Sequence, residues 1–169
     1  MQTTATKDFL QGIEMLWQES KNRELLFVGL MKKDCLGQLR KHCHRGHISS
    51  LLFQNDIRWI YDSFKSNIID FTLGNHPPNT LNKKITESLV AEAGDFQAVM
   101  NLLKSTEFHI IQSYQEVLQL VDYEEEVRGI LLDHLGLFTQ LRDNLVNFQT
   151  SYSVVIPRNS HQSEQMIQA

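Results

Sequence analysis

Proline is scarce in this sequence, and its few positions show where long helices must end. The 169 residues include three prolines, of which Pro77 and Pro78 stand near the middle and Pro157 near the end. Because proline lacks a backbone N–H and clashes with the preceding turn of a helix, long proline-free spans permit long helices. The segment from Gly74 to Thr80 is therefore the strongest loop signal, and it divides the chain into two helical halves.

Cysteine is also scarce, a basic tail and long apolar runs are missing, and each of these features excludes a class of protein. Cys35 and Cys43 are too few for a disulfide framework and lie at the wrong spacing for a zinc pair. A formal net charge of -4 without a basic tail argues against a nucleic-acid partner. No stretch approaches the roughly 20 apolar residues of a membrane-spanning helix, and residues 1–7 lack the apolar core of a signal peptide. We therefore expect a cytoplasmic protein that binds neither nucleic acid nor membrane.

Motifs of common enzymes are missing as well. The chain has no glycine-rich phosphate loop, no Gly-x-Ser-x-Gly nucleophile elbow and no carboxylate pair with an evident cleft. The run from Cys43 to His47 has the helical spacing of metal ligands, but no second Cys/His cluster completes a structural zinc site. These observations favour a protein without catalytic residues.

What the sequence does contain is helical periodicity. Apolar residues recur every three or four positions in four stretches, which are separated by the central loop and by weaker breaks at 32–34 and 122–124. The four stripes are Ile13, Trp17, Ser20, Glu24, Phe27 and Met31; Leu39, Cys43, His47, Ser50, Phe53, Ile57, Ile60, Phe64, Ile68 and Phe71; Phe96, Met100, Leu103, Glu107, Ile110, Tyr114, Val117 and Val121; and Val127, Leu131, His134, Phe138, Leu141, Leu145 and Phe148.

This periodicity predicts an all-α fold with a simple organisation. Two helical hairpins, 7–73 and 95–150, are expected to form an antiparallel four-helix bundle, because helices of this length pack side by side. A crossover segment, 74–94, joins the two hairpins. The whole arrangement belongs to one domain, 1–157.

The segments outside the four stripes have weaker signals. Residues 80–92 are expected to form a short crossover helix whose apolar face is Ile85, Leu89 and Val90. Residues 152–157 show the one strand-like pattern, which could extend against the bundle. The polar, glutamine-rich tail 158–169 is expected to be flexible.

Charge is unevenly distributed between the two halves. From Lys21 to Arg45 there are seven basic and two acidic residues, whereas from Glu87 to Asp133 there are ten acidic and two basic residues. One interpretation is two solvated faces of opposite sign. The other is a homo-oligomer in which the basic hairpin of one copy faces the acidic hairpin of another.

Each of the four stripes contains one Glu or His at a position where the period demands an apolar residue. These residues are Glu24, His47, Glu107 and His134. Antiparallel pairing places each Glu within about one turn of the His on the neighbouring helix. The four could bind iron, manganese or zinc, since carboxylate and imidazole together suit these metals. Alternatively, each Glu hydrogen-bonds a His, or a rotation by one position carries these groups to the rim of the bundle.

In the second half, Glu107 is followed seven residues later by Tyr114, and a Glu-Val-Arg run opens the last predicted helix. Through these features residues 8–150 resemble the uncharacterised bacterial ferritin-like domains. The first half is similar to the matching hairpin. The residues that carry this similarity are Asp95, Leu118, Glu126, Val127, Arg128 and Arg142 in the second half, and Ile13, Leu16, Glu24, Phe27, Leu39, Arg40 and Phe53 in the first.

The resemblance implies a ferritin-like bundle of two hairpins. Di-iron ferritins carry a Glu on the first and third helices and Glu-x-x-His on the second and fourth. Glu24 and Glu107 match the single-Glu positions of that pattern. The Glu-x-x-His positions hold other residues, namely Arg45 and Ile48 in one hairpin and Asp133 and Gly136 in the other. This departure counts against a di-iron centre.

Two function hypotheses follow. The leading one is a non-catalytic helical bundle without a cofactor, which acts through protein interaction or self-association or as a small stress-associated structural unit. The alternative is a metal-binding, ferritin-like oxidoreductase or iron-handling protein. In that alternative the ligands to iron, manganese or zinc are Glu24, His47, Glu107 and His134.

Overall fold

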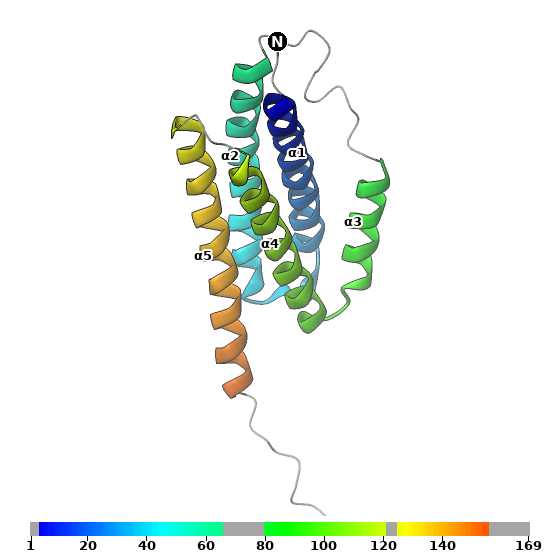
Figure 1. The fold of residues 1–169 in the computed structure, drawn as a ribbon. Helices are drawn as coiled ribbons and strands as arrows, with labels where there is room; N and C mark the ends of the chain where they lie inside the picture. The colour runs from blue at the N-terminus through cyan, green and yellow to red at the C-terminus, as the bar shows by residue number, and fades with distance from the viewer. Residues whose placement is uncertain (1–3, 66–79, 121–124, 156–169) are drawn as a thin grey trace, which may run out of the picture.

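The computed structural model of the protein describes residues 4–65, 80–120 and 125–155 (Figure 1). Within these ranges the chain forms α-helices and one short 3-10 turn, and it has no β-strand. The prediction of an all-α fold is confirmed. The elements are α1 (Thr4–Met31), η1 (Asp34–Leu36), α2 (Leu39–Lys65), α3 (Thr80–Glu92), α4 (Phe96–Gln119) and α5 (Glu125–Val155).

The helices pack as neighbours in a definite order. α1 lies against α2, α4 and α3, whereas α5 lies against α4 and α2. Figure 1 shows that α1 and α5 run in one direction and that α2 and α4 run in the other. α3 returns from the end of the molecule where α2 ends to the end where α4 begins. In the described ranges, no helix combines the length and the apolarity needed to cross a membrane.

Local sequence signals account for several helix boundaries. The predicted break at 32–34 lies between α1 and η1, and Gly37 follows with φ of 49°, a left-handed conformation that glycine adopts without strain. The crossover helix has the bounds predicted from the sequence. Asp95 caps α4, because its Oδ1 accepts a hydrogen bond of 2.7 Å from the backbone N–H of Ala98.

Two local predictions are wrong. Residues 152–155 continue α5 instead of extending as a strand, because no helix breaker precedes Pro157. On α3, Ile85 and Leu89 are exposed and only Val90 of the predicted apolar face packs against the core. The reason is that α3 contacts α1 through a different side, where Thr86 is buried.

Some predictions fall on residues that the structure does not describe. These are the loop at 74–79, the break at 122–124, the end of the second stripe at Ile68 and Phe71, and the tail 158–169.

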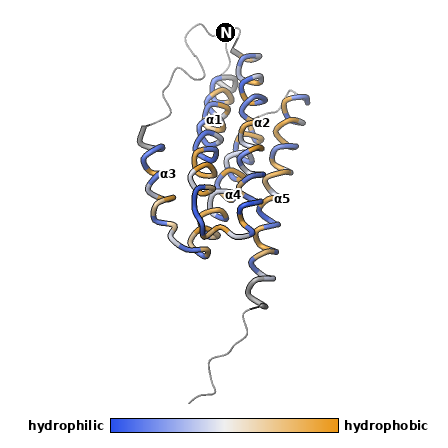
Figure 2. The backbone as a smooth tube through the Cα atoms, turned by 180° about the vertical axis from the view of Figure 1, so that it is seen from behind, coloured by the Kyte–Doolittle hydropathy of each residue, from blue (hydrophilic) through white to orange (hydrophobic). Residues whose placement is uncertain are grey.

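The apolar core consists of two clusters, one near each end of the molecule. Hydrophobic and hydrophilic residues alternate every few positions along the helices (Figure 2), and the hydrophobic ones that point inward build both clusters. One cluster includes Ile13, Ile57 and Tyr114, and the other includes Phe27 and Leu103. Between the two clusters, the buried residues of α1, α2 and α4 are polar apart from one glycine: Ser20, Arg23, Gly46, Ser49, Ser50 and Glu107.

Gly46 of α2 lies directly against the Phe27 ring of α1. An added Cβ there would lie 2.4 Å from Cζ of Phe27, a side chain with no exposed surface. The missing side chain of Gly46 therefore makes room for the Phe27 ring.

Substitution of Gly46 tests this contact. We expect Gly46→Ala to lower the free energy of unfolding by about 1 to 3 kcal/mol, because the buried Phe27 ring has little room to move. Gly136→Ala is the matched control, since Gly136 is also helical but nothing lies within 4 Å of its added Cβ. The control should raise stability by about 0.5 to 1 kcal/mol. Urea unfolding measures both changes, and the same effect at both glycines would contradict the packing.

Candidate functional site

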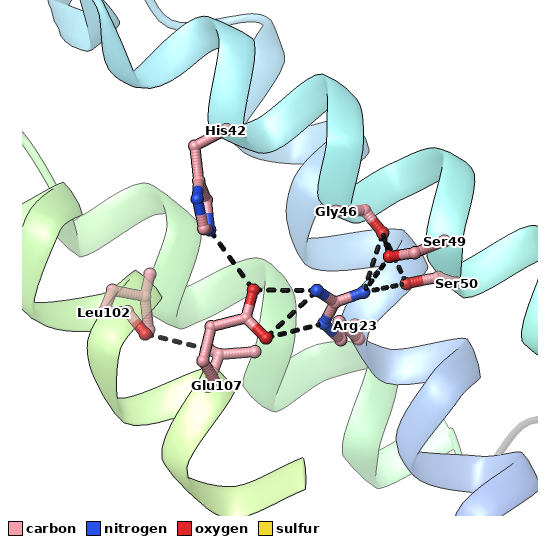
Figure 3. A network of polar contacts seen from close by, with 8 residues as sticks. Arg23, His42, Gly46, Ser49, Ser50, Leu102 and Glu107 are labelled. Carbon is pink, nitrogen blue, oxygen red and sulfur yellow. Dashed lines mark hydrogen bonds and ion pairs between the residues drawn. The ribbon is translucent and has the colours of Figure 1, made fainter. Parts of the chain in front are cut away.

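A layer of buried polar side chains crosses the molecule between the two apolar clusters. We call it the polar layer; it consists of Arg23, His42, Ser49, Ser50 and Glu107 together with the carbonyl of residue 46 (Figure 3). Arg23 comes from α1, His42 and the two serines from α2, and Glu107 from α4. Arg23 is 2% exposed and Glu107 is fully buried, so both charges are removed from water.

Arg23 is the centre of the polar layer. Its Nη2 donates to both carboxylate oxygens of Glu107, at 2.7 and 3.0 Å, and its Nε donates at 3.3 Å. Its Nη1 donates to the carbonyl of Gly46 at 2.7 Å and to the hydroxyls of Ser49 and Ser50 at 3.0 and 2.8 Å. A guanidinium carries its five N–H donors on these three nitrogens. Every nitrogen of Arg23 therefore has at least one hydrogen-bond partner.

Aromatic rings also surround the guanidinium. The centroids of Phe27 and Phe138 lie 4.6 and 4.8 Å from Cζ of Arg23. Aromatic faces attract a cation within about 6 Å, and more strongly where water is excluded. Phe138 belongs to α5, so Arg23 contacts side chains or backbone of all four long helices.

Glu107 remains ionised in this surrounding. Burial acts to raise the pKa of its carboxyl group, but the charge of Arg23 and the hydrogen bonds from His42 and Arg23 outweigh that effect. The pKa of Glu107 therefore lies below its ordinary value of 4.5. Nε2 of His42 lies 3.2 Å from Oε1 of Glu107 and completes the set of partners.

A second polar chain runs from the surface into the apolar core. Nε2 of His134 lies 3.0 Å from Oδ2 of the half-exposed Asp56, and Nδ1 lies 3.0 Å from the hydroxyl of Tyr114. The imidazole stacks on the ring of Phe53, with centroids 3.7 Å apart. The carboxylate of Asp56 accepts a hydrogen bond from Nε2–H, and Nδ1 of the neutral imidazole then accepts one from Tyr114.

Burial determines the direction in which the pKa values of His134 and Tyr114 are shifted. Burial lowers the pKa of His134 below 6.5, although Asp56 and Asp133 act in the opposite direction. Burial also raises the pKa of the Tyr114 hydroxyl, so this group stays protonated and acts as a donor to His134.

The four residues that the sequence singled out are in different places. Glu107 and His134 are both buried. Glu107 belongs to the polar layer, whereas His134 belongs to the hydrogen-bonded series that joins Asp56 to Tyr114. Glu24 is half-buried at the rim, where Nε2 of Gln54 donates to it at 2.8 Å. His47 is half-buried too, and its Nδ1 has no partner among the described residues.

The structure does not join these four side chains. In the described part of the chain, no hydrogen bond links any two of them, and no group of three or more His, Cys, Asp or Glu side chains is placed to hold a metal ion. Of the structural alternatives, a place at the rim applies to Glu24, while Arg23 beside it is buried. A rotation of the whole helix by one position does not occur, because Ile13 and Phe27 of the same predicted stripe are buried. A hydrogen bond between Glu and His occurs at Glu107, but with His42.

Sequence reasoning missed Arg23, because charged side chains are almost never fully buried unless they are paired. One signal was present in the sequence. Gly46, Ser49 and Ser50 place three small residues on one face of α2, which leaves space and acceptors for a long donor side chain. Asp56 was missed because no local pattern pairs it with a histidine 78 residues further along the chain.

Comparisons with protein-family models, curated proteins and solved structures gave no match to this chain. The ferritin-like resemblance therefore stays a prediction.

A double-mutant cycle measures how strongly Arg23 and Glu107 depend on each other. Arg23→Met or Glu107→Leu alone should cost about 3 to 5 kcal/mol of unfolding free energy, because each leaves a buried charge without its partner. The double variant should cost far less than the two losses added together. Lys83→Met, which breaks the exposed pair with Glu87, is the control and should cost less than about 0.5 kcal/mol. Additive losses in urea unfolding would contradict a coupled buried pair.

His134 gives stability a pH dependence of known sign. Because its folded-state pKa lies below the ordinary 6.5, the unfolded chain binds more protons as the pH falls, and the free energy of unfolding falls with it. The loss begins as the pH drops through about 6.5 and continues toward the folded-state pKa. Urea unfolding at pH 7.5 and 5.5 should show this loss in the wild type and a smaller one in His134→Gln. An equal slope in both proteins would assign the pH dependence to other groups.

Proposed function

We propose that this chain is a non-catalytic helical bundle of the ferritin-like class that acts by self-association. The path of the chain supports the class. α1 with α2 and α4 with α5 are neighbouring antiparallel pairs, and α3 carries the chain back along the molecule between them. Two hairpins joined by one long crossover connection are the arrangement of ferritin-like bundles.

The polar interior supports a structural role for its charged groups. Arg23 and Glu107 use their hydrogen-bonding groups on each other and on α2. His134 likewise has a partner at each ring nitrogen. Buried polar groups that satisfy one another in this way determine how helices pack.

The observation that carries the proposal is the exposed apolar face of α2. Ile48, Leu51, Leu52 and Trp59 are between 41% and 57% exposed. Ile48, Leu52 and Trp59 are spaced by four and seven residues, which places them on one side of a helix, and Leu51 lies beside them. We call these four residues the outer face of α2.

The polarity of α2 is inverted in its middle. There the buried residues other than Phe53 are small or polar, namely Gly46, Ser49, Ser50 and Gln54. The outward residues Ile48, Leu51 and Leu52 are large and apolar. A helix that only had to pack on its own core would place apolar residues inward and polar residues outward. Exposed apolar clusters of this kind are typical of protein interaction sites, and tryptophan is enriched among residues that dominate binding energy.

Sedimentation velocity tests the proposal with a closely matched pair of variants. The wild type should form a dimer as its concentration rises, and Ile48→Asp should weaken the dimer by about tenfold or more, because a charge replaces apolar contact. Ile85→Asp on α3 is the control, since Ile85 is 48% exposed and Ile48 is 49% exposed. It should leave the dimer unchanged. A wild type that stays monomeric at high concentration would overturn the proposal.

A further inference from the structure

The charges of α2 are sorted along the length of the helix. Its first two turns carry Arg40, Lys41 and Arg45 without an acidic residue, and its later turns carry both of its acidic residues, Asp56 and Asp62. The guanidinium of Arg40 donates to the backbone carbonyls of Met31 and Lys33. Arg58 also lies in the later part, but its guanidinium is placed over the Trp17 ring of α1, 5.0 Å from the centroid. Among the ion pairs of the described residues, none involves Lys41, Arg45 or Asp62.

Lys41 and Asp62 border the outer face of α2 at its two ends. Lys41 precedes Ile48 by seven residues, and Asp62 follows Asn55 by seven, so each lies two turns further along the same side. Both side chains are exposed. The outer face is thus an apolar centre with a free positive charge at one end and a free negative charge at the other.

This distribution is complementary to itself in one orientation. Lys41 lies ten residues before Leu51, and Asp62 lies ten residues after Leu52, which is about 15 Å along a helix in each direction. A two-fold axis between Leu51 and Leu52 therefore brings Lys41 of one copy level with Asp62 of the other. The symmetry forms this Lys41–Asp62 pair two times in the dimer. A parallel pairing in the same register would instead place Lys41 against Lys41 and Asp62 against Asp62.

The same axis also pairs the residues between these charges. Leu51 of each copy is level with Leu52 of the other, Ile48 with Asn55, and His44 with Trp59. Arg45 is level with Arg58, whose guanidinium lies over the Trp17 ring of its own copy. The pairs of Leu51 with Leu52 lie at the centre and the ion pairs at the ends, and an apolar centre with a polar rim is the distribution of stable interfaces. Lys65 would lie level with the residue before the start of α2, outside the overlap.

We infer that two copies of this chain pair through the outer faces of α2, antiparallel and in the register that joins Lys41 to Asp62 of the other copy. The inference rests on the self-association proposed above and adds its orientation and register. Such a contact is isologous, so it closes after two copies.

Charge reversal tests the register. Lys41→Asp and Asp62→Lys should each weaken the dimer by about tenfold, because each places two like-charged pairs in the interface. The combined variant should restore the affinity, since the reversed charges again attract. Lys84→Asp, the same change on exposed α3, is the control and should leave the affinity unchanged. Circular dichroism and melting of every variant verify that it folds.

Mixed disulfide formation tests the orientation. Ile48→Cys and Asn55→Cys are made in a Cys35→Ser background; Cys43 can remain, because burial raises the pKa of its thiol to about 12 and keeps it unreactive. When one variant carries a mass label, oxidation of the mixture should yield mainly the 48–55 disulfide. Mainly 48–48 and 55–55 disulfides would overturn the antiparallel arrangement.

The outcomes separate the inference from the proposed function. A monomeric wild type overturns both. A dimer that Ile48→Asp weakens but that the combined charge reversal does not restore overturns the register and leaves self-association standing. A dimer with charge rescue and the mixed disulfide supports both.

Discussion

The packing of this protein depends on one buried ion pair, Arg23 with Glu107. The pair joins α1 to α4, and the remaining donors of Arg23 reach the backbone and hydroxyls of α2. Two charges out of water are tolerated only with close geometry and further hydrogen bonds, and both conditions hold here. A shift of any of these helices by one residue would leave a buried donor or acceptor without its partner. The polar layer therefore sets the register of the helices more strictly than the two apolar clusters, whose contacts tolerate small displacements.

The polar layer also accounts for the unusual composition of α2. Its inner surface must offer Arg23 a carbonyl and two hydroxyls, and Gly46 must leave room for Phe27 beside the guanidinium. Small and polar residues consequently take inner positions that would otherwise bury large apolar side chains. Ile48, Leu51 and Leu52 in this part of α2 are exposed instead, and that inversion is the physical basis for the proposed self-association. The composition of the inner face of α2 and that of its outer face thus both follow from the polar layer.

His134 extends polar contact into the apolar cluster near the other end of the molecule. Its ring is held on three sides by Asp56, Tyr114 and Phe53, from two neighbouring helices. Each of these contacts suits the neutral imidazole. The polar layer therefore relies on an ion pair, whereas the contacts of His134 rely on a neutral ring. Acid consequently affects the stability of these two groups of contacts differently.

The amino-acid sequence by itself determined the helical class, the break after α1, the bounds of α3 and most inner apolar positions. These follow from proline placement and from a period of three to four residues, which are local properties. It also identified Glu107 and His134 as inner polar groups. The tertiary structure decided their partners. Arg23 and Glu107 are 84 residues apart in the chain, and no local pattern shows which helix faces which.

The difference between local pattern and tertiary contact also explains why the predictions for the inner faces of α1 and α3 were wrong in part. On α1, Arg23 is buried where Glu24 was expected, although Ile13, Ser20 and Phe27 of the same predicted stripe are buried as well. The buried side of this helix is wide, and periodicity does not show which residues at its edges are covered. Ile85 and Leu89 formed a plausible inner face for α3, but the side that α1 covers depends on where the crossover lies. Which charges are buried is a global property, since a buried charge is stable only beside a partner that the fold brings to it.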